Sequence, residues 1–494
     1  MHHSILKKST INIHFHRKFS VNDQSKPEFK LLQVFLNWVA SCLTPLSLFS
    51  IKETVRLKDT CDQYEHINLS YPSVYLKYHK IEISHTMPLL GRNSMQKFAS
   101  LASMITFFCL IISLLCMRPA YGEDEPFIFG LLMAGSHQDQ GRSQTIFEAG
   151  KFVEIKIPGT KMIFIDKVNP ADRPGMTIPL LVDDMVEKGA RLIIASALDM
   201  QEGLREAALQ HPDIYYIQIS GDDVLTNKAP RNLSNLTGRL EYGQMMAGFA
   251  AALTTKTGKV GYLGSRIDQE SLRLTSSAFL GARYGWEKVL NKDPKELKFQ
   301  VIWIGWRLNL PEVTADPVRV ANDFFNTGFD VVISGIDTNE VLTVAQQKHN
   351  EGKPVRAIGS NYPGACEASP EVCLGVPVSN WGPGLVQLIQ SAISAEWKSK
   401  WLLLDPDWKD VNNPDTRTVG FVPGSALSGP VKTALHTFVN DMGSGRLNLL
   451  KGPLNYQDGK PFLKTGEVAD AGRLWFMEQL LEGMSGQNKA NKSE

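Results

Sequence analysis

A regular alternation of short apolar runs and helical stretches, which begins at Pro126, most constrains the fold of this chain. The apolar runs are rich in Ile, Val, Phe and Tyr, and each leads into a longer stretch with helical periodicity. This alternation is typical of βαβ units whose parallel strands are buried on both faces. The expected strands of the first set are 127–133, 161–166, 191–196 and 213–219.

The pattern restarts after a Gly- and Ala-rich helix expected at 241–257. Two successive sets predict an α/β protein with two doubly wound, Rossmann-like lobes joined by a hinge. A helix (385–397), a strand (419–422) and a further helix (431–441) follow Trp381, so we expect the chain to cross back and complete both lobes. The expected strands of the second set are 259–264, 299–304, 330–334 and 356–359.

This pattern also divides the chain into domains. Lobe 1 is expected to comprise 123–240 and lobe 2 to comprise 241–378, and each is completed by part of 379–484. Residues 485–494 are expected to form a flexible tail.

The segment 95–122 has the features of a secretory signal peptide. Lys97 precedes an apolar stretch that is shorter than the roughly 20 residues of a membrane-spanning helix. Ala120-Tyr-Gly122 then supplies a small-x-small site, so we expect cleavage after Gly122 and a periplasmic location. A lipid-anchored form through Cys116 stays open, although bulky Leu115 fits poorly with lipoprotein processing.

Residues 1–94 precede this signal and show no sustained helical or strand period. We interpret them as a leader upstream of a true start at Met95. The alternative is a membrane-anchored form with a cytoplasmic extension, because 31–51 is apolar enough to suggest a membrane segment, although Asn37 and Pro45 interrupt it.

The net charge bears on whether the chain binds nucleic acid, and the positions of the cysteines bear on whether it forms a disulfide. Lys plus Arg (52) and Asp plus Glu (51) nearly cancel, which disfavours a nucleic acid partner. Cys366 and Cys373 are close neighbours in the body of the chain, and in an oxidising compartment we expect them to form a disulfide. Two unpaired thiols are the alternative.

In open parallel sheets, ligands bind beyond the carboxyl ends of the strands. With the lobes facing each other, the loops at those ends line one cleft. These loops are 136–141, 169–173, 196–199 and 221–223 in lobe 1, and 264–266, 306–309, 335–338 and 361–362 in lobe 2.

Several segments resemble, in order, the basic membrane protein family of solute-binding proteins. The resemblance covers about residues 126–484, and its most specific part is the ending Ser444-Gly445 followed by Lys451-Gly-Pro-Leu-Asn-Tyr-Gln-Asp-Gly459. The other matching segments are 206–216, Met245-Met-Ala-Gly-Phe-Ala-Ala251, 254–261, 328–332 and Asp337-Thr338.

The resemblance implies a type I periplasmic-binding fold, an ABC importer permease as partner, and a purine nucleoside or related purine as ligand. It places Asp139, Trp306, Asp337 and Trp381 at family positions that contact the ligand. This chain departs from the related proteins at two cleft loops. Arg142 stands after Asp139-Gln-Gly141 where they have Trp, and Asp316-Pro317 is delayed by an insertion.

A purine needs aromatic faces to stack on, which Trp306 and Trp381 would supply, and hydrogen-bond acceptors, which Asp139 and Asp337 would supply. Arg142 is expected to contact the ligand and fits an acidic metabolite instead. Ser196, Asp199, Thr338, Asn361 and Tyr362 are further candidate contacts by loop position.

Each candidate also has a structural alternative. An Asp after a strand often caps a helix. The tryptophans suit a core, lobe interface or hinge, and Arg142 suits a surface salt bridge.

The sequence contains no motif for hydrolytic, metal or nucleotide chemistry, and apart from His2 and His3 in the leader its histidines are scattered singly. We therefore expect a monomeric, non-enzymatic binding protein with no cofactor and no metal. Two other classes stay open. One is a ligand-sensing module of a membrane signalling partner, and the other is a hydrolase on a similar fold.

Overall fold

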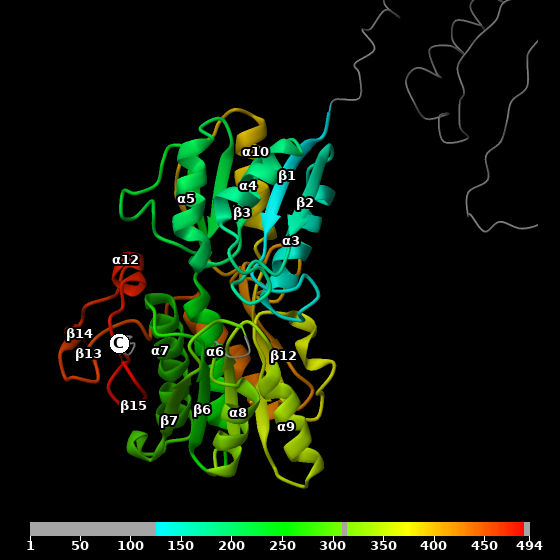
Figure 1. Ribbon diagram of the computed structural model, residues 1–494. Helices are drawn as coiled ribbons and strands as arrows, with labels where there is room; N and C mark the ends of the chain where they lie inside the picture. The colour runs from blue at the N-terminus through cyan, green and yellow to red at the C-terminus, as the bar shows by residue number, and fades with distance from the viewer. Residues whose placement is uncertain (1–124, 309–313, 489–494) are drawn as a thin grey trace, which may run out of the picture. The chain divides into compact units, whose positions relative to one another are not determined.

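The computed structural model describes residues 125–308 and 314–488, and both of its large sheets belong to one compact unit, 122–494. The expected leader, signal peptide and start site therefore lie outside the described residues. In the described part, the expected α/β class is confirmed, because two mainly parallel sheets are each covered by helices (Figure 1).

Lobe 1 is built on a six-stranded, all-parallel sheet in the order β11-β5-β4-β3-β1-β2. Helices α3 and α10 pack on one side with one apolar core, and α4 and α5 form a second core on the other. The strands are β1 (Phe127–Leu132), β2 (Thr160–Ile165), β3 (Ala190–Ala195), β4 (Tyr215–Ile219), β5 (Leu233–Gly238) and β11 (Trp401–Leu404). The helices are α3 (Arg142–Lys156), α4 (Ile178–Glu187), α5 (Gln201–Gln210) and α10 (Gly382–Ile393).

Lobe 2 is built on a seven-stranded sheet in the order β12-β10-β9-β8-β6-β7-β15, in which only β12 runs antiparallel to its neighbour. The strands are β6 (Lys259–Gly264), β7 (Lys298–Trp303), β8 (Val331–Gly335), β9 (Arg356–Ile358), β10 (Cys373–Ser379), β12 (Val419–Pro423) and β15 (Met484–Ser485). Helices α6 (Leu240–Thr254), α7 (Gln269–Tyr284) and α11 (Gly429–Gly443) share one core, and α8 (Pro317–Asn326) and α9 (Glu340–Asn350) share the other.

The chain passes between the lobes three times in the described residues. It leaves lobe 1 after β5, returns from β10 to α10, and leaves again between β11 and β12. Each lobe is thus completed by a segment from the last quarter of the chain, as the pattern after Trp381 predicted. The division into two domains stays a prediction.

The last described residues correct the expected tail. Ser485 belongs to β15, which pairs with β7, and the indole N–H of Trp303 donates to the carbonyl of Gln487 (2.8 Å). This segment is ordered because it completes the edge of the lobe 2 sheet. A short hairpin, β13 (Leu454–Asn455) and β14 (Pro461–Leu463), and the helix α12 (Ala471–Trp475) precede it.

The structure also contains strands that the apolar pattern did not predict, including β5, β10 and β11. Strand β5 (Leu-Ser-Asn-Leu-Thr-Gly) carries buried polar residues, whose side chains are used in local hydrogen bonds. The amide of Asn235 donates to the carbonyl of Ser220 (3.2 Å), and the hydroxyl of Ser234 accepts from the N–H of Lys400 (3.1 Å). Such a strand has no apolar signature.

Candidate functional site: a polar cavity between the lobes

A cavity of about 50 Å³ lies where the two lobes meet, at the carboxyl ends of their strands. That volume holds a few water molecules, whereas small-molecule pockets usually measure roughly 300 Å³ or more. A ligand the size of a nucleoside therefore requires the lobes to separate. The polar lining residues are Arg142, Gln244, Tyr262, Ser265, Glu270, Ser271, Thr275, Arg307, Asp337, Ser360, Asn361 and Ser379.

The lobes touch directly through the loops around this cavity. The backbone N–H of Arg142 donates to the carbonyl of Asp337 (3.1 Å), and the side-chain amide of Asn339 donates to the carbonyl of Gln140 (2.6 Å). The hydroxyl of Ser220 in lobe 1 donates to Glu270 of lobe 2 (2.8 Å). These bonds hold the lobes in a closed arrangement.

An ion-pair network reinforces this closure. Asp199, which follows β3 of lobe 1, pairs with Arg266 of lobe 2 and lies 3.8 Å from Arg307. Arg307 also pairs with Asp268 (2.8 Å) and Glu270 (3.0 Å). The network therefore joins one carboxylate of lobe 1 to four charged residues of lobe 2.

The pKa values in the network follow from this pairing. Burial disfavours the charged guanidinium of Arg307, yet its neighbours Asp268 and Glu270 raise its pKa above the ordinary value. Burial works against the ionised form of Glu270, yet Arg307 and Arg142 hold the pKa of Glu270 below its usual range. For Asp199, burial outweighs Arg307 and Arg266, so its pKa is raised. Arg307 and Glu270 are thus held charged.

Arg142 enters the same cavity from the start of α3 and has a different environment. Its side chain is buried, with 6% of the residue exposed, and its guanidinium carbon lies 5.1 Å from the centre of the Trp381 ring. The guanidinium donates to the carbonyl of Ser196 (3.4 Å) and the hydroxyl of Ser220 (3.3 Å). No carboxylate of the described residues forms an ion pair with it. The alternative of a surface salt bridge is therefore wrong for Arg142.

Asp337 lines the cavity at the end of β8. Burial raises its pKa to about 6, and the positive charges of Arg142 and Arg307 only partly offset this effect. Its backbone is fixed, because its N–H donates to the carbonyl of Arg307 (2.8 Å) and its carbonyl accepts from Arg142. The structure thus places a carboxylate with a pKa near 6 beside a buried guanidinium.

Asp139 does not line the cavity. Its carboxylate accepts hydrogen bonds from the backbone N–H groups of Gly141 (2.8 Å), Ser143 (3.2 Å) and Gln144 (3.0 Å), at the start of α3. Burial raises its pKa, although these bonds favour the ionised form. This arrangement corresponds to the helix-capping alternative, and Asp139 contributes by fixing the turn that places Arg142.

The two candidate tryptophans also lie outside the cavity lining. Trp381 is 1% exposed in the core of lobe 1, immediately before α10, and contacts the cavity only through Arg142. Trp306 is half-buried and lies under the guanidinium of Arg266 (5.4 Å). In this closed arrangement Trp381 is buried and Arg266 lies over one face of Trp306.

The candidates chosen by loop position divide into three groups. Asn361 lines the cavity, and its backbone adopts a φ of 62°. Ser196 and Asp199 act between loops, as hydrogen-bond acceptor for Arg142 and as ion-pair partner across the lobes. Thr338 donates to Glu340 (2.6 Å) and Tyr362 is paired with Glu148 of lobe 1, so both lie at the rim and neither lines the cavity.

The sequence reasoning missed Glu270 and Arg307, which carry much of the cavity's charge. Glu270 lies in the first turn of α7, which corresponds to the helical stretch expected between the first two strands of the second set, and it was not among the candidate residues. Arg307 directly follows Trp306 in a cleft loop that the pattern did predict, so loop position was the available signal.

Cys366 and Cys373 form a disulfide, with Cα atoms 5.4 Å apart. The bridge closes the loop between the short turn after β9 and the start of β10. It thereby stiffens the segment that leads away from Asn361.

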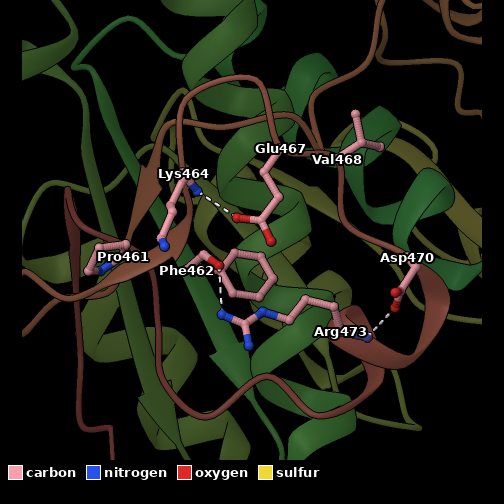
Figure 2. A pocket seen from close by; sticks show the side chains of 7 residues that line it. All are labelled: Pro461, Phe462, Lys464, Glu467, Val468, Asp470 and Arg473. Atoms are coloured by element: carbon pink, nitrogen blue, oxygen red, sulfur yellow. Dashed lines mark hydrogen bonds between the residues drawn. The ribbon is translucent and has the colours of Figure 1, made fainter.

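A second hollow, of about 310 Å³, lies on the C-terminal segment between β14 and α12 and does not touch the cavity between the lobes (Figure 2). Its polar groups already pair with each other. Glu467 accepts from the N–H of Lys464 (2.8 Å), and the guanidinium of Arg473 donates to the carbonyl of Phe462 (2.9 Å). This hollow is therefore a surface feature of the hairpin.

Among residues 125–308 and 314–488, no cluster of three or more His, Cys, Asp or Glu is arranged to hold a metal ion. In the same residues, no helix combines the length and apolar character needed to cross a membrane.

Two facing α/β lobes with a polar cavity at the carboxyl ends of their strands are the arrangement of the type I periplasmic-binding fold. A solved ABC transporter solute-binding protein from Aeropyrum pernix K1 has this fold. It is 14% identical, covers 67% of this chain and 93% of its own, and superposes with a TM-score of 0.51.

Residues 173–406 match the family described as ABC transporter substrate-binding protein PnrA-like. A purine-binding protein of Brucella abortus is 25% identical over 347 residues, which cover 70% of this chain and 85% of that protein. Basic membrane protein A of Borreliella burgdorferi is 33% identical over 143 residues, covering 29% of this chain and 39% of that protein. The predicted family is thus confirmed, and the family's name implies a small-molecule ligand and a transporter as partner.

Proposed function

We propose that this protein is exported, captures a purine nucleoside or related purine between its two lobes, and delivers it to the permease of an ABC importer. The observation that carries this proposal is the cavity, which Arg142 of lobe 1 and a larger set of polar residues of lobe 2 line where the lobes close on each other. A ligand that contacts both walls favours the closed form, which is the form a permease can distinguish from the empty one.

The relatives and the composition of the cavity support this reading. One relative is named for purine binding, and the cavity supplies hydroxyl, amide, carboxylate and guanidinium groups for a polar heterocycle. Its walls come from one chain, so a monomer suffices for binding. The protein acts by binding, without turnover.

The first test is the thermal midpoint of the purified protein with a panel of nucleosides, free bases and acidic metabolites. A ligand at 100 times its dissociation constant stabilises the folded state by about 2.7 kcal/mol, which gives an easily measured shift. A shift with a nucleoside or base, without its breakdown in the same mixture, supports the proposal. Turnover of the nucleoside would favour the hydrolase reading instead.

An acidic metabolite is the second candidate ligand, because Arg142 is a buried cation without an ion-pair partner among the described residues. A midpoint shift with acidic compounds alone would replace the purine with this ligand class and leave the transport role in place.

Export is tested separately. The proposal places the mature N-terminus at Glu123, after a signal peptide removed at Gly122. N-terminal sequencing of the protein recovered from the periplasm checks this, and an intact N-terminus on cytoplasmic protein would contradict it.

A further inference from the structure

Arg142 is a strong donor whose present acceptors are weak. Its guanidinium reaches two uncharged oxygens at 3.3–3.4 Å, whereas Arg307 reaches carboxylates at 2.8 and 3.0 Å. Charge-assisted hydrogen bonds are ordinarily about 2.7–2.9 Å long. The position of Arg142 is nevertheless well defined, because Trp381 lies beneath its plane and its backbone is bonded to Asp337. A fixed, buried guanidinium with unsatisfied donor capacity is suited to an acceptor on a ligand.

The charges that line the cavity indicate that this ligand is neutral. Arg142 and Arg307 are balanced by Glu270 and Asp337. An anion attracted to Arg142 would also be repelled by the Asp337 carboxylate, whose pKa Arg142 already lowers against the effect of burial. A neutral ligand that carries a separate acceptor and donor can hydrogen-bond to both Arg142 and Asp337 without adding a net charge to the cavity.

We propose that Arg142 makes the site selective for 6-oxopurines over 6-aminopurines, by donating two N–H groups to O6 and N7 of the base. This inference rests on the proposed purine ligand. Arginine pairs in this bidentate way with the O6 and N7 acceptors of guanine. A 6-aminopurine presents an amino group at position 6. This group is a donor and cannot accept a hydrogen bond from the guanidinium, which is also a donor.

Two more groups of the cavity agree with this assignment. Within the described residues the Asp337 carboxylate accepts no hydrogen bond, and when ionised it can only accept. A 6-oxopurine carries N1–H as a donor, whereas N1 of a 6-aminopurine is an acceptor. The hydroxyl of Ser379 is buried in the cavity wall without a partner and can donate or accept.

The test compares ligands that differ only at the base edge. Binding of inosine against adenosine, and of hypoxanthine against adenine, is measured by calorimetry on the purified wild-type protein. The bidentate contact predicts that the 6-oxo compounds bind about ten-fold to a hundred-fold more tightly. 7-Deazainosine, which lacks N7, is expected to lose most of this advantage.

Two variants test whether Arg142 causes the preference for 6-oxopurines. Arg142→Met is expected to bind inosine and adenosine with similar affinity. The matched control is Arg191→Met, because Arg191 also lies over an aromatic ring (Phe127, 4.4 Å) but is exposed and outside the cavity. That variant keeps the wild-type preference.

The outcomes separate this inference from the proposed function. Equal or tighter binding of adenosine by the wild type overturns the 6-oxo selectivity and leaves the purine ligand in place. Preference for inosine that persists in Arg142→Met removes Arg142 from the inference. If no purine binds and an acidic metabolite does, both the inference and the purine ligand fall.

Discussion

Two buried arginines enter the same cavity from opposite lobes, and their surroundings differ. Arg307 of lobe 2 lies against Asp268 and Glu270, with Asp199 of lobe 1 slightly farther away. The guanidinium of Arg142 in lobe 1 donates only to neutral oxygens and lies over the Trp381 ring, and it acts on Asp337 and Glu270 without forming an ion pair. A buried charge that is paired serves the fold, because removing it strands its partners. A buried charge that is unpaired is available to a ligand.

The largest effect that this comparison predicts is on stability. Arg307→Met removes the ion-pair partner of the buried Glu270 and one of the two arginines that pair with Asp268, and is expected to cost about 3–5 kcal/mol. Arg142→Met breaks no ion pair, although it removes a charge that acts on Asp337 and Glu270, and it is expected to cost much less. Thermal and urea unfolding of the two variants measure the difference. Equal losses would show that Arg142 is as structural as Arg307.

The second prediction concerns the stability of the unliganded protein against pH. The pKa of Asp337 is about 6 in the folded state, above the roughly 3.9 of an unfolded Asp. The stability linked to its protonation is therefore present at low pH and is lost as pH rises from about 4 to 6, by roughly 3 kcal/mol. Asp337→Asn should then be the more stable protein at pH 7.5 and similar to wild type at pH 4. A variant that is less stable at pH 7.5 would contradict this.

The same carboxyl predicts how binding depends on pH. The groups that act on it are Arg142, Arg307, Glu270 and Asp139. A ligand N–H donor binds the ionised form, so affinity should fall as pH drops below about 6 and level off above 7. Asp337→Asn should remove this dependence. Calorimetric titrations at pH 5 and pH 7.5 measure both, and a pH-dependent variant would assign the effect to another group.

The smallest expected effect concerns the contact between the lobes. Asp199→Asn removes the lobe 1 carboxylate that pairs with Arg266 and lies near Arg307, which should weaken closure by about 1 kcal/mol. Small-angle scattering of the unliganded variant should then show a larger radius of gyration. Glu154→Gln, which breaks the pair with Lys151 inside α3, is the matched control and should leave it unchanged. An unchanged radius of gyration in Asp199→Asn would show that these ion pairs do not stabilise the closed arrangement.

Much of the fold was predictable from local pattern. The apolar runs around β1, β3, β6 and β8 are buried on both sides of a sheet, which gives them a continuous hydrophobic signature. Strands β5 and β11 were not predicted. The first is half polar, and the second is four residues long and comes from a distant part of the chain.

The candidate site was predictable only as a set of loops. Because parallel strands end at one edge of a sheet, the sequence alone determined that Arg142, Asp337 and Asn361 lie near the cleft. Only the tertiary structure decided that the Asp139 carboxylate is used to cap α3 and that Trp381 lies behind Arg142. It also decided which arginine is paired. The acids around Arg307 come from α7 and from the other lobe, and no local pattern specifies contacts between residues so far apart in sequence.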